Sequence, residues 1–477
     1  MSGTRRNLPL PPGEGRGEGG TAWTALTQPS PGGRGLFAGE RYAVVGLGRN
    51  GLPVAHALAA MGAEIAVWDD RADARADAPF PLRTPAQGYR GFTALVLSPG
   101  IPHRLPVPHP AALAAAEAGI PIVSDAELLY QATRRRRSGA RFVGVTGTNG
   151  KSTTTALLHH ILVSAGWDSA AGGNLGTPAL ALPVLGDEGV YVLEMSSYML
   201  ERVATLRFDA AALLNLSPDH MDRHGDMPGY VAAKLHIFDR QSAGQAAVFG
   251  IDDAETEALA GPDAITISGH RPADYWCDDG LLRTPDGPLV RLEEAPALPG
   301  SHNAQNAAAA AALATALGVP REAIADGIRT FPGLPHRQQL VATIDGVAWV
   351  NDSKATNADA AARALACYDR VVWIAGGEAK EGGIAPLRPL FPRIAHALLI
   401  GRDAHLLAAT LAEAAVPHTI TGTLEQAVPQ AGHLAREAGA QAVLLSPACA
   451  SFDQFPGFEA RGDRFAALAR AALREPA

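Results

Sequence analysis

Residues 144–155 form a glycine-rich segment that could bind phosphate. They read Gly-Val-Thr-Gly-Thr-Asn-Gly-Lys-Ser-Thr-Thr-Thr, between a short apolar run and a helical stretch. In such a turn backbone N–H groups converge on phosphate oxygens, Lys151 adds a positive charge and Ser152 offers a hydroxyl to Mg²⁺. Strict Walker A spacing would place a glycine where this chain has Val145, so the segment is a related form. It predicts binding of a nucleoside triphosphate.

Two further polar residues stand where predicted strands end. Glu194 closes the apolar run 190–193, and a carboxylate there is placed to hold Mg²⁺ directly or through water. The alternative is that Glu194 partners a helix N-terminus. His220 lies in a loop beyond the run 210–216, where a histidine suits a metal or a phosphate oxygen but is often structural.

Three residues cannot be assigned from their surroundings alone. The periodicity around Lys234 predicts an ordinary lysine on a helix surface. Asn303 and Asn306 begin an alanine-rich helical stretch, where Asn303 could cap the helix or could read a purine through its amide.

The elements that must position these residues alternate between strands and helices. The run from Tyr42 leads into Gly46-Leu-Gly-Arg-Asn-Gly51 and a helix, and a second strand ends at Asp69. Taken alone, this is the fingerprint of a dinucleotide-binding fold, which would indicate a dehydrogenase. Further strands are predicted within 94–100 and at 120–123, 190–193, 210–216, 347–350, 371–374, 397–400 and 442–445. The alternation predicts three α/β domains in series.

We expect the domains at 39–132, 133–333 and 334–477. Residues 1–38 are rich in glycine and proline and are predicted to be a disordered low-complexity tail without activity. Truncation before Leu36 should then leave turnover intact.

Composition limits the partners of this protein. Its 477 residues are 47% hydrophobic and 18% charged, with a net charge of −8, which argues against a nucleic-acid or membrane-surface binder. The three cysteines are odd in number and widely separated, which fits a reducing compartment. No apolar run approaches the roughly 18 residues that span a bilayer. We expect a cytoplasmic monomer that does not insert into membranes.

Six motifs, in this order, resemble the Mur ligase family. They are Gly-Thr-Asn-Gly-Lys-Ser, Leu-Glu-Met-Ser-Ser, Asn-Leu-Ser-Pro-Asp-His-Met-Asp-Arg, His-Asn-x-x-Asn, Leu-Pro-His-Arg and Asn-Asp-Ser-Lys-Ala-Thr-Asn. The resemblance covers about residues 40–470. Residues 444–455 and 458–462 resemble the branch that adds D-glutamate. The resemblance implies a Rossmann-like first domain, a P-loop-type central domain and a Rossmann-like C-terminal domain. It also implies ATP-dependent ligation of D-glutamate to UDP-N-acetylmuramoyl-L-alanine through an acyl phosphate, a step of peptidoglycan precursor synthesis.

The resemblance also implies roles for individual residues. The catalytic set would be Lys151, Glu194, His220 and Lys234. The residues implied for ATP are Gly147, Thr148, Asn149, Gly150, Lys151, Ser152, Thr153, Asn303, Asn306, Arg337 and Asp352. Those implied for the UDP-substrate are Arg49, Asn50, Asp70, Arg71, Gly100, Asn174 and His220, and those for D-glutamate are Lys354, Thr356, Lys380, Ser451, Phe452 and Phe458. Two Mg²⁺ ions would be held by Ser152, Glu194, His220 and Lys234, the last as a CO₂-derived carbamate, because a carbamate is an anionic oxygen ligand whereas an ammonium repels the metal.

Three rival interpretations remain at this stage. A folylpolyglutamate synthetase would share the phosphate loop but should lack the first domain. A dehydrogenase would have no reason to carry a complete ATP and Mg²⁺ site. A non-catalytic relative acting as a binding module should have lost Lys151, Glu194 or Lys234, and all three are present.

Overall fold

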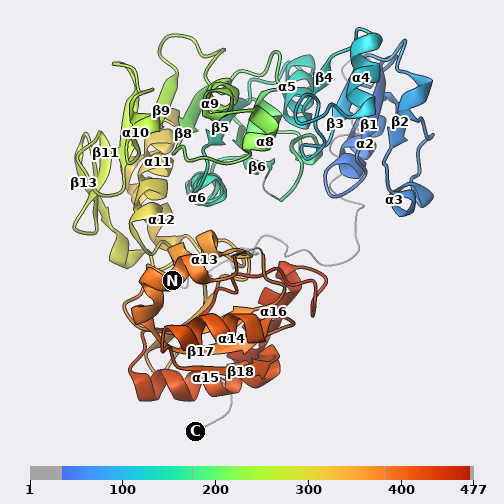
Figure 1. Ribbon diagram of the computed structural model, residues 1–477. Coiled ribbons are helices and arrows are strands. Elements are labelled where there is room, and N and C mark those ends of the chain that lie inside the picture. Colours follow the sequence, from blue (N-terminus) through green and yellow to red (C-terminus); the bar gives the residue numbers. More distant parts are fainter. Residues whose placement is uncertain (1–34, 175, 381, 473–477) are drawn as a thin grey trace, which may run out of the picture.

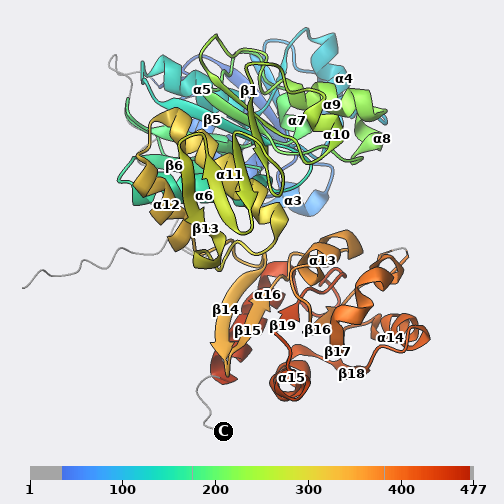
Figure 2. The same cartoon turned by 90° about the vertical axis from the view of Figure 1, so that its left-hand side faces the viewer.

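The computed structural model describes residues 35–174, 176–380 and 382–472. They form three α/β units, built on sheets of four, nine and six strands. Figure 1 shows the first and central units side by side, with the C-terminal unit below the central one, and Figure 2 shows the same separation from the side. The predicted fold class, three α/β domains in series, is confirmed.

The first unit is a parallel sheet with the strand order β2-β1-β3-β4. Its strands are β1 (Arg41–Val45), β2 (Glu64–Trp68), β3 (Ala94–Leu97) and β4 (Ile122–Val123), and its helices are α2 (Gly51–Ala60), α3 (Ala72–Ala76), η1 (Pro85–Gln87), α4 (Pro110–Glu117) and α5 (Asp125–Arg135). Val44 and Val45 point into different core clusters, so both faces of the sheet are buried. This explains the continuous apolar runs of its strands. The expected boundary at 132/133 falls inside α5.

The last four residues of the expected tail belong to the fold. Residues 1–34 lie outside the described residues, but Phe37 is fully buried and packs edge-on against Tyr42 at a centroid distance of 5.6 Å. The Phe37 N–H also donates to the Met61 carbonyl at 3.0 Å. The prediction that the tail extends to residue 38 is therefore wrong. The glycine-rich and proline-rich composition of this stretch predicts disorder, and it gave no indication that Phe37 is part of the core.

The central unit is a nine-stranded sheet with the order β13-β12-β11-β10-β9-β8-β5-β7-β6. Neighbouring strands run parallel from β6 to β11, and β12 and β13 are antiparallel additions. The strands are β5 (Arg141–Thr146), β6 (Ser169–Gly173), β7 (Val190–Glu194), β8 (Ala210–Leu213), β9 (Ala246–Gly250), β10 (Ile265–Ser268), β11 (Tyr275–Asp278), β12 (Leu281–Thr284) and β13 (Gly287–Arg291). The helices are α6 (Lys151–Ser164), η2 (Ala179–Ala181), α7 (Ser197–Leu200), α8 (Met221–His224), α9 (Met227–Leu235), α10 (Ala254–Glu257), η3 (Leu292–Glu294), α11 (Ser301–Leu317) and α12 (Arg321–Thr330).

Helix α11 explains the alanine-rich stretch of the sequence. Its residues Ala307 to Ala312 are all fully buried, because the helix packs against α6 and against several strands at once. Small side chains allow this close packing on every side of the helix. The N-terminal end of α11 consequently lies beside the first turn of α6.

The C-terminal unit is a six-stranded sheet with the order β14-β15-β19-β16-β17-β18, in which only β14 pairs antiparallel among the described strands. The strands are β14 (Gln339–Ile344), β15 (Val347–Asn351), β16 (Val371–Gly376), β17 (Ile394–Ile400), β18 (His418–Gly422) and β19 (Ala442–Leu445). The helices are α13 (Ala358–Leu365), η4 (Ala385–Arg393), α14 (Ala404–Glu413), α15 (Leu424–Ala438) and α16 (Phe458–Ala472). A search of the described helices finds none with the length and apolar character needed to span a bilayer.

Candidate active site

The loop between β5 and α6 has the conformation of a phosphate cradle. Gly150 adopts a φ of 84°, and a Cβ added there would overlap Asn306 Oδ1. Asn215, at the end of β8, holds the loop by accepting hydrogen bonds from the Thr148 N–H at its carbonyl oxygen, 2.9 Å, and from the Asn149 N–H at Oδ1, 2.8 Å. We did not assign a role to Asn215 from the sequence, although its place in the Asn-Leu-Ser-Pro motif was a usable signal.

Lys234 is buried against this loop, although it belongs to α9. Its side chain is only 2% exposed, and Nζ donates to the Gly147 carbonyl at 2.8 Å. The prediction of a surface lysine is therefore wrong, since α9 turns Lys234 toward the loop and away from solvent. Burial, followed by the charge of Lys151, lowers the pKa of Lys234 well below its usual value.

Glu194 lies opposite the loop with both carboxylate oxygens engaged. Ser152 Oγ donates to Oε2 and Asn174 Nδ2 donates to Oε1, each at 2.8 Å. Ser196, not Glu194, caps the short helix α7 that follows, so the helix-partner alternative fails. A serine hydroxyl and a buried carboxylate are oxygen donors of the kind that Mg²⁺ prefers, and this part of the predicted metal site fits the ion.

His220 makes no contact with Ser152 or Glu194 among the hydrogen bonds and ion pairs of the described residues. It adopts a φ of 55°, and its Nε2 lies 3.4 Å from Asp219 Oδ2. The His220 ring lies beside the ring of Tyr230, with a distance of 6.5 Å between the ring centroids. Lys234 Nζ lies 4.6 Å from the centroid of the same Tyr230 ring. Among the described residues, no three His, Cys, Asp or Glu side chains form a ready metal cluster.

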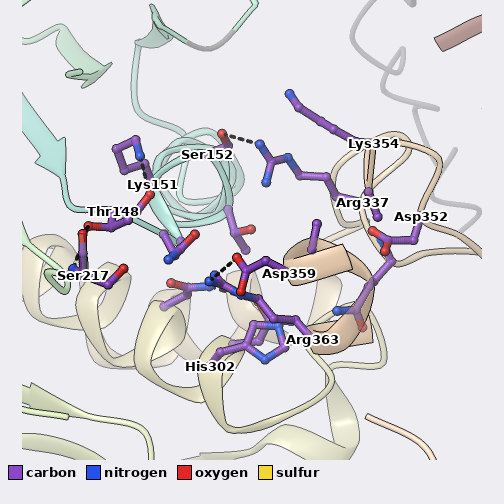
Figure 3. Close-up of a pocket in the computed structure, with 18 of the residues that line it drawn as sticks. Thr148, Lys151, Ser152, Ser217, His302, Arg337, Asp352, Lys354, Asp359 and Arg363 are labelled. Atoms are coloured by element: carbon purple, nitrogen blue, oxygen red, sulfur yellow. Dashed lines mark hydrogen bonds and ion pairs between the residues drawn. The ribbon is translucent and has the colours of Figure 1, made fainter. Parts of the chain in front are cut away.

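A cavity of about 620 Å³ lies between the central and C-terminal units (Figure 3). Most of the residues predicted for ATP line it, namely Thr148, Asn149, Gly150, Lys151, Ser152, Thr153, Asn303, Asn306, Arg337 and Asp352. Gly147 contributes the carbonyl that accepts from Lys151 and Lys234. The lining also contains residues that sequence reasoning missed, among them Asp219, Asn357, Asp359 and Arg363.

The two asparagines at the start of α11 connect that helix to the phosphate loop. Asn306 Oδ1 accepts from Thr154 Oγ1 at 3.3 Å, and Asn306 Nδ2 donates to Asn303 Oδ1 at 3.0 Å. Gly300 occupies the N-cap position, and Asn303 Nδ2 donates to the Pro299 carbonyl. Asn303 is therefore not the N-cap residue of this helix.

Arg337 and Asp352 reach the cavity from the C-terminal unit. Arg337 Nη2 donates to Ser152 Oγ at 3.2 Å, which ties this unit to the phosphate loop, as Figure 3 shows. Asp352 accepts from Ser446 Oγ at 2.7 Å and from the Gln338 N–H at 3.1 Å. Burial nevertheless raises the pKa of Asp352 to about 7.

The residues predicted for D-glutamate are only partly brought together. Lys354 lines the cavity, its Nζ lies 5.2 Å from the centroid of the Phe458 ring, and burial lowers its pKa to about 8. Ser451 Oγ is buried without a hydrogen-bond partner among the described residues. Phe452 is 71% exposed. Thr356 and Lys380, like Ser451, Phe452 and Phe458, lie outside the described lining of this cavity.

A second cavity, of about 520 Å³, lies on the first unit. All the first-unit residues predicted for the UDP-substrate line it, namely Arg49, Asn50, Asp70, Arg71 and Gly100, together with Asn174 from the central unit. Asp69, the acid of the dinucleotide fingerprint, accepts from the Leu47 N–H at 2.7 Å and the Arg71 N–H at 3.0 Å. Its carboxylate therefore holds the glycine-rich loop itself. His109, which sequence reasoning missed, hydrogen-bonds Asp70 and lowers the pKa of that carboxyl.

The fold and the two cavities define a three-unit α/β protein with a P-loop-type central unit beside a Rossmann-like first unit. Two family models match the chain, the Mur ligase middle domain over residues 145–314 and the Mur ligase glutamate ligase domain over residues 336–449. The chain belongs to the Mur ligase family, which confirms the resemblance seen in the sequence.

The most informative relatives carry one particular name. The UDP-N-acetylmuramoylalanine–D-glutamate ligase of Paramagnetospirillum magneticum is 49% identical over 91% of this chain and 97% of its own length. The protein of that name from Rhizobium meliloti is 47% identical over 90% and 96%. Among solved structures, the MurC ligase of Thermotoga maritima matches with a TM-score of 0.58 at 17% identity, covering 91% of this chain and 99% of its own, which shows the shared fold.

Proposed function

We propose that this protein joins D-glutamate to UDP-N-acetylmuramoyl-L-alanine at the expense of ATP. The observation that carries the proposal is the position of Asn174, which lines the cavity of the first unit and the phosphate cavity and also holds Glu194. A substrate whose UDP lies in the first cavity can therefore extend its carboxylate to the phosphate loop. The names of the relatives support this substrate and this amino acid.

The reaction proceeds by acyl activation. A carboxylate oxygen of the UDP-sugar attacks the γ-phosphorus of ATP, and the bond to the bridging oxygen breaks to release ADP. The amine of D-glutamate then attacks the acyl carbon, loses a proton and displaces inorganic phosphate, leaving an amide. Lys151, which lines the cavity, would neutralise charge that develops on the transferred phosphoryl group.

Ser152 and Glu194 would hold Mg²⁺, with His220 and a carbamate on Lys234 completing the sites of two ions. When bound, Mg²⁺ supplies positive charge against the phosphate oxygens. Lys234 suits carbamate formation, because its buried amine has a pKa well below the usual value and an unprotonated amine is the form that combines with CO₂.

The C-terminal unit would bring D-glutamate to the acyl phosphate. Lys354 already reaches the cavity and Ser451 Oγ is buried with an open hydrogen-bonding capacity. Thr356, Lys380, Phe452 and Phe458 would join them when the unit closes over the cavity. Closure would also exclude water, which would otherwise hydrolyse the acyl phosphate.

Phosphate release tests this proposal. The full chain is incubated with ATP, Mg²⁺ and UDP-N-acetylmuramoyl-L-alanine, and D-glutamate, L-glutamate or no amino acid is added. We expect release that requires both the UDP-sugar and D-glutamate. If neither D-glutamate nor L-glutamate supports phosphate release, the assignment of the C-terminal unit is wrong. Other amino acids and the folate substrates would then be tested next.

We further propose that the protein works as a cytoplasmic monomer. Its three cysteines are free, which suits a reducing compartment.

A further inference from the structure

The phosphate cavity meets another cavity, of about 400 Å³, on the central unit. Six described residues line both cavities, and they mark the junction: Asn149, Gly150, Ser217, His302, Asn306 and Arg363. Arg363 is the only one of the six that comes from the C-terminal unit. His302 is neutral at neutral pH because burial lowers its pKa to about 4. Arg363 is therefore the only cation among the described residues at the junction.

The chemistry of the 400 Å³ cavity fits a nucleoside without its phosphates. Its two carboxylates are already committed, Asp252 to Ser268 Oγ and the Gly269 N–H, and Asp253 to the first turn of α10. Gln305 lines this cavity and is 4% exposed, and its Nε2 is buried behind the lining without a hydrogen-bond partner among the described residues. Such a buried donor suits an acceptor atom on a base or a ribose.

A nucleotide whose phosphates bind the loop between β5 and α6 would therefore extend from the phosphate cavity into the smaller cavity and pass Arg363 where the two cavities meet. The nucleoside would occupy the smaller cavity, and the phosphate chain would begin beside the guanidinium. Lys151 lines the phosphate cavity but not the smaller one, so it would meet the terminal phosphates instead.

Arg363 reaches this junction from the C-terminal unit, with its side chain 36% exposed. It lies on α13, where Asn357 Oδ1 caps the helix and Asp359 Oδ2 accepts from Arg363 Nη2 at 3.0 Å, as seen in Figure 3. Cys367 Sγ donates to the Arg363 carbonyl, and a Cβ on Gly300 would come within 3.1 Å of that sulfur. Cys367, two residues beyond α13, therefore lies near the N-cap residue of α11.

We propose that Arg363 binds the nucleoside-proximal phosphate of ATP and so carries the C-terminal unit into the nucleotide site. The inference rests on the proposed function only for the identity of the nucleotide. A guanidinium that forms charge-assisted hydrogen bonds to phosphate contributes roughly 10-fold to 100-fold in affinity. Lysine retains the charge but not the planar pair of donors, so Arg363→Lys should recover only part of this effect.

Titration of the full chain with ADP and with adenosine tests the inference. Arg363→Ala should weaken ADP about 10-fold to 100-fold, leave adenosine within about twofold, and be partly corrected in Arg363→Lys. Arg388→Ala is the matched control, because Arg388 also pairs with an acid, Glu413, on the surface of the same unit. In the ligase assay, Arg363→Ala should raise the KM for ATP and leave the KM values for D-glutamate and the UDP-sugar unchanged.

Two results would overturn the inference. An unchanged ADP affinity would show that Arg363 does not contact the phosphate chain near the nucleoside, and an equal loss for adenosine would place its effect on the nucleoside. A wild-type chain that binds ADP but forms no amide would remove the proposed function, and the ADP titration would still decide the role of Arg363. Melting curves of each variant establish that it is folded.

Discussion

Lys151 and Lys234 donate hydrogen bonds to the same carbonyl oxygen, that of Gly147, at 2.9 and 2.8 Å. Two ammonium groups so close would repel each other, and burial disfavours charge on either one. Burial accordingly lowers the pKa of both lysines, and the charge of Lys151 adds to the effect on Lys234. Of the two, Lys234 therefore has the stronger tendency to lose its proton, because its pKa is lowered by burial and by the charge of Lys151.

Replacing Lys234 should remove activity that a small carboxylate can restore in part. We expect Lys234→Ala to lose about 100-fold to 1000-fold in turnover, since a preorganised anionic ligand would be missing. Formate or acetate should occupy the space and supply oxygen atoms. Wild-type protein with the same carboxylate is the control and should gain nothing. Full turnover of Lys234→Ala without any carboxylate would contradict the carbamate.

The contact between Arg337 and Ser152 should matter for turnover more than for folding. Arg337→Lys keeps the charge but cannot reproduce the planar pair of donors, so we expect kcat to fall about 10-fold to 100-fold with a similar melting temperature. Arg370→Lys is the control, because Arg370 is an exposed arginine of the same unit that bonds a backbone carbonyl. Equal kcat values for the two variants would show that the contact has no part in the reaction.

The site residues at strand ends could be predicted from the sequence, and those placed by packing between units could not. Glu194 is the last residue of a parallel strand, and such strands end at the same edge as the phosphate loop. Lys234 lies on a short helix whose local pattern is that of a surface helix, and only its packing on the loop buries it. Arg363 pairs with Asp359 four residues away, as on any exposed helix. The residues around Arg363 in the sequence do not indicate that its side chain faces the central unit.

Asp352 should make the stability of the protein depend on pH near neutrality. Its carboxyl has a pKa of 3.8 without burial and about 7 in the fold. Between these values the folded state retains a proton that the unfolded state has lost, so the free energy of unfolding decreases as the pH rises from about 4 to about 7. Each unit of pKa shift corresponds to about 1.4 kcal/mol. Asp352→Asn should be more stable than wild type above pH 7 and should match it below pH 4.

Chemical unfolding at a series of pH values measures this difference. Asp369→Asn, at an exposed carboxylate of the same unit, is the control and should follow wild type at every pH. Parallel profiles for wild type and Asp352→Asn would mean that the carboxyl is ionised in the fold throughout this range.

Phe37 should separate a dispensable segment from the folded chain. Its ring is fully buried, and the Arg135 guanidinium lies 4.4 Å from the ring centroid. We expect Phe37→Ala to cost roughly 3–5 kcal/mol in the unfolding of the first unit, and Phe37→Leu to cost less. Two truncations make the same comparison, because deletion through residue 34 retains Phe37 and deletion through residue 38 removes it. The first should unfold like the full chain and the second at lower denaturant. Equal transitions would restore the boundary at residue 38 that composition predicts.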